Sequence, residues 1–87
     1  MIIGKVVGSV VSTRKNDNLI GSKFMVIEPC AGMAQSRLVA VDNVGAGIGE
    51  MVLVATGSAA RIGCNLETSP IDAAIVGIVD SGSELEF

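Results

Sequence analysis

The sequence predicts an all-β protein: a small five-stranded barrel with one or two short helical turns. Three observations predict it. Five short runs of residues with high β-propensity recur along the 87-residue chain. Glycine, proline or polar turn residues separate these runs at regular intervals. Two glycines inside the first run share one face, which suits a strongly curved sheet.

The first strand is expected over residues 2–13, where Val and Ile alternate with smaller or polar residues. Lys5 and Ser9 lie on one face of this strand and suit the wetter side. We therefore expect the even-numbered face to point inward. Its members are Ile2, Gly4, Val6, Gly8 and Val10.

The other four strands follow polar or small-residue turns. A polar turn at residues 14–18 leads toward the second strand, and Pro29 is expected to end that strand because proline cannot donate to a ladder. The expected ranges are 23–28, 36–42, 51–56 and 74–80. Five strands in one short chain fit an OB-like barrel, and no repeat or linker divides residues 1–87, so one domain is expected.

Two short helical turns are expected between and after the later strands. Ser58 is a candidate N-cap for one turn through Arg61. Ser69, Pro70 and Asp72 have the residue types of a second helix start, with Ser at the cap and Pro at the first helical position. This second helix must be short because the fifth strand follows directly.

The composition is more apolar than a small monomer needs. Hydrophobic residues make up 49% of the chain and the mean hydropathy is +0.62, yet a domain of this size buries only about 60% of its unfolded surface. We interpret the excess as surface that is buried against further copies of the same chain. No apolar run reaches the roughly 18 residues of a membrane span, and the N-terminus lacks signal-peptide features, so a cytoplasmic protein is expected.

The cysteines fit that compartment. Cys30 and Cys64 stand far apart in the sequence with no CxxC pattern. In a reducing cytosol both are expected to be buried thiols, and a disulfide between them is the less favoured alternative.

A glycine loop at residues 45–50 invites a nucleotide-binding interpretation. The dinucleotide fingerprint needs glycine at the position that Glu50 occupies, and a strand follows instead of a helix. Glu50 would also place a negative charge against a phosphate. The loop is therefore interpreted as a structural turn that allows close packing.

Catalytic and metal-binding equipment is scarce. The chain has no histidine, so Cys30 and Cys64 lack the usual base, and the acids at 42, 50, 72 and 80 stand at element ends, where turn bonds explain them. The sequence predicts neither an enzyme, nor a metal site, nor a cofactor. The rival hypothesis of a small enzyme would need a carboxylate pair or one of the thiols.

An OB-like barrel that binds an oligonucleotide or small ligand is the alternative function. Such sites use aromatic platforms and basic grooves, but Phe24 and Phe87 are the only aromatic residues and the net charge is −3. We therefore expect no nucleic-acid partner.

Three ordered motifs resemble the EutN/CcmL family of bacterial microcompartment vertex proteins. They are GKVVGSVVSTRKNDNLIGSKFMVI at 4–27, DNVGAGIGEMVLVATGSAAR at 42–61 and PIDAAIVGIVD at 70–80. The resemblance spans essentially the whole chain. It departs at Ala59, where the family often carries a second serine, so any role of that hydroxyl is lost here.

The resemblance implies a structural role without catalysis. It implies an OB-like barrel in a homopentamer that caps the vertices of a microcompartment shell, in the cytoplasm, beside hexameric shell proteins. A cyclic ring uses two different patches on each subunit. We place the 45–50 loop with Arg61 in one patch, and the first strand or the turn at 70–74 in the other. The residues expected at the subunit interface or five-fold axis are Asp42, Gly45, Ala46, Gly47, Gly49, Glu50, Gly57, Ser58, Ala59, Ala60, Arg61, Pro70 and Asp72.

Overall fold

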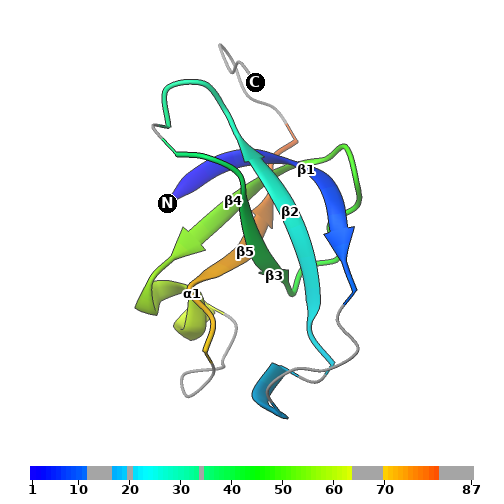
Figure 1. The fold of residues 1–87 in the computed structure, drawn as a ribbon. Coiled ribbons are helices and arrows are strands. Elements are labelled where there is room, and N and C mark those ends of the chain that lie inside the picture. The colour runs from blue at the N-terminus through cyan, green and yellow to red at the C-terminus, as the bar shows by residue number, and fades with distance from the viewer. Residues whose placement is uncertain (12–16, 20, 34, 64–69, 81–87) are drawn as a thin grey trace.

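Five strands close into a barrel in a computed structural model that describes residues 1–11, 17–19, 21–33, 35–63 and 70–80 (Figure 1). The strand order around the barrel is β1-β2-β3-β5-β4. The elements are β1 (Ile2–Val10), the 3-10 turn η1 (Asp17–Leu19), β2 (Lys23–Pro29), β3 (Leu38–Asp42), β4 (Met51–Thr56), α1 (Ser58–Gly63) and β5 (Ala73–Ile78). The predicted five-stranded all-β barrel is confirmed.

Four of the five strand contacts are antiparallel and well populated. β1 pairs with both β2 and β4, β2 pairs with β3, and β4 pairs with β5. The parallel contact between β3 and β5 is much shorter, since its register includes only Val41 with Ala74 and Asp42 with Ile75. The barrel therefore closes through one short contact, and we call this β3–β5 junction the seam.

The predicted inward face of β1 is confirmed for its first half. Ile2, Gly4 and Val6 are buried, and a side chain at Gly4 would place Cβ 2.5 Å from the Ile27 side chain and 2.9 Å from a backbone oxygen. This glycine thus permits the close approach of β2. After Val6 the register shifts, and Val10 lies 40% exposed, so the second half of the face leaves the core.

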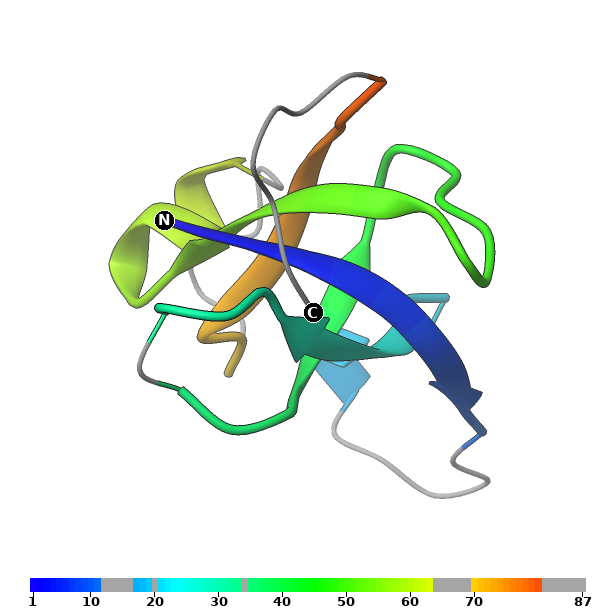
Figure 2. The ribbon, with the colours of Figure 1, turned by 90° about the horizontal axis from the view of Figure 1, so that it is seen from above.

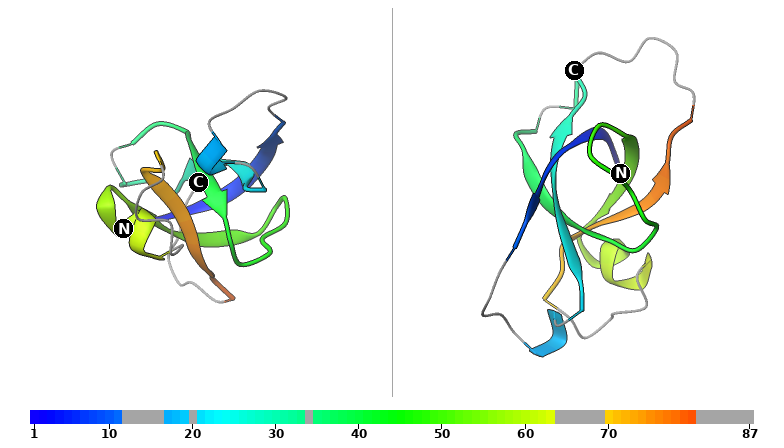
Figure 3. Two further views of the ribbon diagram at one scale, coloured as in Figure 1. Left: turned by 90° about the horizontal axis from the view of Figure 1, so that it is seen from below. Right: turned by 90° about the vertical axis from the view of Figure 1, so that its right-hand side faces the viewer.

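The barrel interior holds the main core, formed by inward residues of all five strands and by one loop residue. Its buried members are Ile2, Val6, Met25, Ile27, Ala40, Ala46, Val52, Val54, Ala73 and Ile75. A second cluster lies on the outer side of the seam, because Val41 and Ala74 alternate with the inward residues of β3 and β5. Ala60 of α1 and Ile71 cover them there, and α1 is accordingly seen outside the barrel wall (Figure 3).

Element boundaries differ from the sequence expectation in several places. β3 begins at Leu38, two residues late, and β5 spans Ala73–Ile78 in place of 74–80. β2 includes Pro29 as its last residue, and the following amide, Cys30 N, donates to Ile3 O at 3.0 Å. The last predicted residues of the first strand, 12 and 13, lie outside the described residues.

The helical predictions have two outcomes. The turn predicted from Ser58 is confirmed and extends to Gly63, whereas Pro70–Asp72 is not helical. Ile71 is instead buried in the second cluster, and Asp72 O accepts a hydrogen bond from Gly57 N at 2.8 Å, which holds this segment extended beside α1. Ser69, the predicted cap, lies outside the described residues. The turn η1 falls where the sequence predicted only a polar loop.

In the described part of the chain, no helix is long and apolar enough to cross a membrane. Cys30 is buried with a free thiol, as expected, and Cys64 lies outside the described residues.

Candidate subunit-contact site

The glycine loop between β3 and β4 is shaped first by Asp42. Its Oδ1 accepts hydrogen bonds from Val44 N at 3.0 Å and Gly45 N at 3.1 Å, which forms a tight Asx-type turn at the end of β3. Gly45 has a φ of +83°, a conformation that side chains rarely adopt. Asp42 therefore serves the turn, as the sequence suggested for acids at element ends.

The second half of the loop is tied to β1 and to itself. Gly49 N donates to Val6 O at 2.8 Å, and Val6 N donates to Glu50 O at 3.0 Å. Gly47 N donates to the Glu50 carboxylate at 2.6 Å, and Glu50 N returns a bond to Gly47 O at 3.1 Å. With Ala46 only 3% exposed and packed in the main core, the loop is a structural turn anchored at its centre.

The other oxygen of Asp42 has no hydrogen-bond partner among the described residues. Asp42 Oδ2 is buried, and the ammonium of Lys23, opposite it on β2, approaches to 3.9 Å. The Asp42 side chain is 1% exposed and that of Lys23 is 66% exposed. Because a buried carboxylate is costly to leave unpaired, this lysine is the cation that offsets it.

The short helix α1 is fastened to the segment before β5. Arg61 Nη1 donates to Ile71 O at 2.9 Å, and Ala60 is fully buried in the second cluster. At its far end the Asn43 side chain donates to Gly63 O at 3.2 Å. Arg61 thus makes a contact within its own chain, and a contact with a neighbouring subunit stays a prediction.

The structure separates two groups that the sequence analysis placed together. The glycine loop precedes β4 and α1 follows it, so residues 45–50 and Arg61 lie at opposite ends of β4 (Figure 2). Six strand residues span about 20 Å. Arg61 belongs with the segment at 70–72, to which it is hydrogen-bonded.

The thirteen candidate residues also differ in exposure. Three of them serve the chain's own fold and are buried: Asp42, Ala46 and Ala60. Gly47 and Arg61 are half-buried. Eight are exposed and available to a partner: Gly45, Gly49, Glu50, Gly57, Ser58, Ala59, Pro70 and Asp72.

Two shallow hollows meet at the seam, beside the residues of β3 that precede its pairing with β5. One, of about 460 Å³, is lined by Gln35, Leu38, Val39, Thr56, Gly57, Asp72 and Ala73. The other, of about 210 Å³, is lined by Leu19, Phe24, Val39, Val41, Pro70, Ile71, Asp72 and Ala73. Because they share Val39, Asp72 and Ala73, we treat them as one surface and call it the seam trough.

Sequence reasoning missed two prominent apolar side chains. Val39, in the seam trough, is 49% exposed, and Ile48, in the glycine loop, is 67% exposed. The signal for Ile48 was available, since it is the one large apolar residue among the glycines of the loop. Val39 stands in an apolar run, and its exposure could not be predicted because the sequence does not show that β3 pairs with β5 over so few residues.

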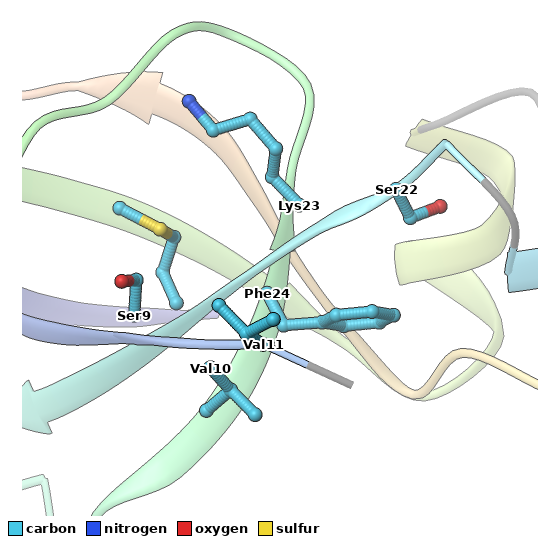
Figure 4. A pocket seen from close by; sticks show the side chains of 7 residues that line it. Ser9, Val10, Val11, Ser22, Lys23 and Phe24 are labelled. Carbon is cyan, nitrogen blue, oxygen red and sulfur yellow. The ribbon is translucent and has the colours of Figure 1, made fainter. Parts of the chain in front are cut away.

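A third hollow, of about 280 Å³, lies where the end of β1 meets the start of β2 (Figure 4). It is lined by Ser9, Val10, Val11, Ser22, Lys23, Phe24 and Met25. The chain on both sides of it continues into residues 12–16 and 20, which the structure does not describe. Nothing shows what covers this hollow, so no function is assigned to it.

Chemically, the described residues offer packing surfaces in place of reactive groups. No group of three or more acid, cysteine or histidine side chains is placed to hold a metal ion among them. The described acids at the loop and seam make turn bonds or lie open to solvent. The loop and the seam therefore offer apolar contacts and a few charges to a partner protein.

Comparison with known proteins assigns the chain to a family. The family model described as ethanolamine utilisation protein EutN/carboxysome matches residues 1–80. The chain belongs to this EutN/CcmL family. The shell vertex protein GrpN of Rhodospirillum rubrum is 49% identical over 84 residues, which cover 93% of this chain and 94% of that protein. The shell vertex protein PduN of Salmonella typhimurium is 43% identical and covers 93% and 97%.

Solved structures of EutN/CcmL members share the fold. The CcmL of Nostoc sp. PCC 7120 superposes with a TM-score of 0.88 at 43% identity, over 100% of this chain and 97% of that one. A structure described as the GrpN pentameric microcompartment shell protein of Rhodospirillum rubrum gives a TM-score of 0.79 at 48% identity, over 93% and 94%. GrpN and PduN are both named bacterial microcompartment shell vertex proteins.

Proposed function

We propose that this protein is a structural shell component that forms a homopentamer and caps the vertices of a bacterial microcompartment. The observation that carries the proposal is the match to vertex proteins along nearly the entire chain, including one solved as a pentamer at 48% identity. The chain acts as one domain over residues 1–87, and it catalyses no reaction.

The proposed partners are further copies of the chain and the hexameric proteins that form the flat parts of the shell, in the cytoplasm. Several large apolar side chains on the described surface support contact with proteins. They include Val7, Val39, Val44, Ile48, Ile62 and Ile78. Exposed apolar surface of this kind marks protein interfaces.

Neither a nucleic acid nor a membrane is a proposed partner. Of the four described basic residues, Lys23, Arg37 and Arg61 each lie close to an acid or carbonyl of the chain itself, and Lys5 is exposed on β1. Phe24 is half-buried against the second cluster and stands alone among the described residues as an aromatic, so no row of rings is available for base stacking. These contacts favour the shell role over the alternative of an oligonucleotide-binding barrel.

The mass of the native oligomer tests this function. Light scattering coupled to size exclusion is expected to give 44 kDa, five times the chain mass of 8.8 kDa. The same fraction is expected to bind purified hexameric shell protein and to leave single-stranded DNA unbound at low salt. A stable monomer at micromolar concentration would overturn the proposal, and salt-dependent retention on single-stranded DNA would revive the alternative.

A further inference from the structure

The glycine loop exposes an apolar side chain to water from a backbone that hydrogen bonds hold in place. Ile48 is 67% exposed, yet the residues on both sides of it are hydrogen-bonded, Gly47 N to the Glu50 carboxylate and Gly49 N to Val6 O. Ala46, buried in the core, anchors the loop two residues earlier. A loop whose backbone is held this way loses little backbone entropy when a partner binds it.

The seam trough is a hollow with a partly apolar lining, large enough to receive such a side chain. Leu38, Val39 and Ala73 line its larger part, which measures about 460 Å³. Val39 is 49% exposed there because β3 pairs with β5 only from Val41 onward. The hollow is thus built into the strand arrangement and does not depend on a mobile side chain.

The loop and the trough have the separate placement that a head-to-tail contact between copies requires. In a ring, one patch of each subunit meets a different patch of the next, so the two patches must lie on different sides of the molecule. The glycine loop and the trough residues Thr56 and Gly57 stand at opposite ends of β4 (Figure 2). One protomer therefore carries both halves of such a contact.

The loop carries an acid, and a cation stands beside the trough. Glu50, two residues after Ile48, is exposed and uses one carboxylate oxygen to accept from Gly47 N. Arg61, hydrogen-bonded to Ile71 O at the trough wall, keeps further N–H donors besides the one in that bond. Asp72 adds a carboxylate to the trough lining, so an approaching acid would meet Arg61 on the Ile71 side of the trough and not beside Asp72.

We infer that Ile48 of one copy inserts into the seam trough of the next copy, with Glu50 facing Arg61 across the contact. This inference rests on the proposed homopentamer and names the surfaces that close it. Val11 is more exposed, at 89%, but it stands beside residues 12–16, which the structure does not describe. Val11 is therefore used as the control position, and Ile48 is the inserted residue.

Disulfide trapping tests the contact directly. In a Cys30→Ala, Cys64→Ala background, the pair Ile48→Cys with Val39→Cys is oxidised mildly and run on a denaturing gel. A ladder that rises from one chain to five is expected, because each copy would link to the next around the ring. The single variants, and the matched pair Val11→Cys with Val39→Cys, are expected to stay monomeric on the gel.

The outcomes separate this inference from the proposed function. If the unsubstituted protein is not a pentamer, the proposed function fails. If the double-cysteine protein keeps the pentameric mass and gives no ladder, the loop-in-trough contact is wrong while the pentamer stands.

A second pair of variants keeps the contact testable if the double-cysteine protein does not assemble. Ile48→Ser is expected to raise the concentration at which the ring dissociates by tenfold or more, whereas Val11→Ser leaves it unchanged. An unchanged dissociation concentration for Ile48→Ser, with the fold intact by circular dichroism, would overturn the inference.

Discussion

The glycine loop and the seam trough differ in how fully their backbone groups and side chains are paired and packed within the chain. The loop has hydrogen bonds at both its turns, a buried alanine at its centre and a ladder contact to β1. The seam has two residue pairs of parallel register, and the start of β3 lies beside a hollow. The loop is held by hydrogen bonds and exposes Ile48, whereas the seam leaves a hollow beside β3. One subunit therefore carries a projecting loop at one end of β4 and a receiving trough at the other.

The largest expected effect comes from the loop anchor. Ala46→Asp buries a charge in the main core, so we expect it to lower the free energy of unfolding by about 3 kcal/mol or more. Ala59→Asp, on the exposed start of α1, should change it by less than about 0.5 kcal/mol. Urea unfolding followed by circular dichroism, at one fixed protein concentration, measures both, and equal effects would show that Ala46 is no anchor.

The turn at Asp42 should come next. Asp42→Ala removes the acceptor for Val44 N and Gly45 N, and we expect a loss of about 1–3 kcal/mol in the same measurement. Asp42→Asn keeps an acceptor oxygen for these amides and should lose less. If alanine and asparagine cost the same, the two hydrogen bonds do not define the loop.

On the seam side, Arg61→Met keeps the aliphatic stem and removes the bond to Ile71 O. We expect it to destabilise the folded chain by about 1 kcal/mol, since the carbonyl is partly buried. Arg37→Met, which removes an exposed ion pair with Glu28, is the matched control and should cost less than about 0.5 kcal/mol. A larger loss for Arg37 than for Arg61 would contradict this account of the seam.

The smallest effect on the isolated fold is expected from Asp72→Asn. The side chain is exposed, and the bond that Asp72 accepts from Gly57 N uses its backbone oxygen. We therefore expect a change below about 0.5 kcal/mol in unfolding. Chemical denaturation that finds a loss above 1 kcal/mol would assign this carboxylate a structural role within the chain.

The barrel was readable from the sequence because its signals are local. Alternation in the first strand, the proline that ends the second and the glycines before the fourth each act within a few residues. Ser58 predicted α1 in the same way. The helix expected at 70–72 was wrong because long-range burial of Ile71 and the bond from Gly57 overrode a local capping pattern.

The candidate site was less readable because exposure is a property of the assembled barrel. Family resemblance pointed to the stretch from Asp42 to Arg61, but not to which of its residues the chain uses for itself. Ala46 and Ala60 look like Ala59 in sequence, and only the fold shows that the first two are buried. The separation of Arg61 from the glycine loop likewise follows from the length of β4.

Mixing two disabled variants tests the head-to-tail contact most directly. Ile48→Asp disables the glycine loop and Val39→Asp disables the seam trough, so each variant alone is expected to sediment as a monomer. In a mixture, the intact loop of the Val39→Asp variant can still enter the intact trough of the Ile48→Asp variant. This predicts a 1:1 heterodimer of 17.6 kDa, twice 8.8 kDa, in analytical ultracentrifugation at high concentration. Pentamers from either variant alone, or only monomers in the mixture, would contradict the account.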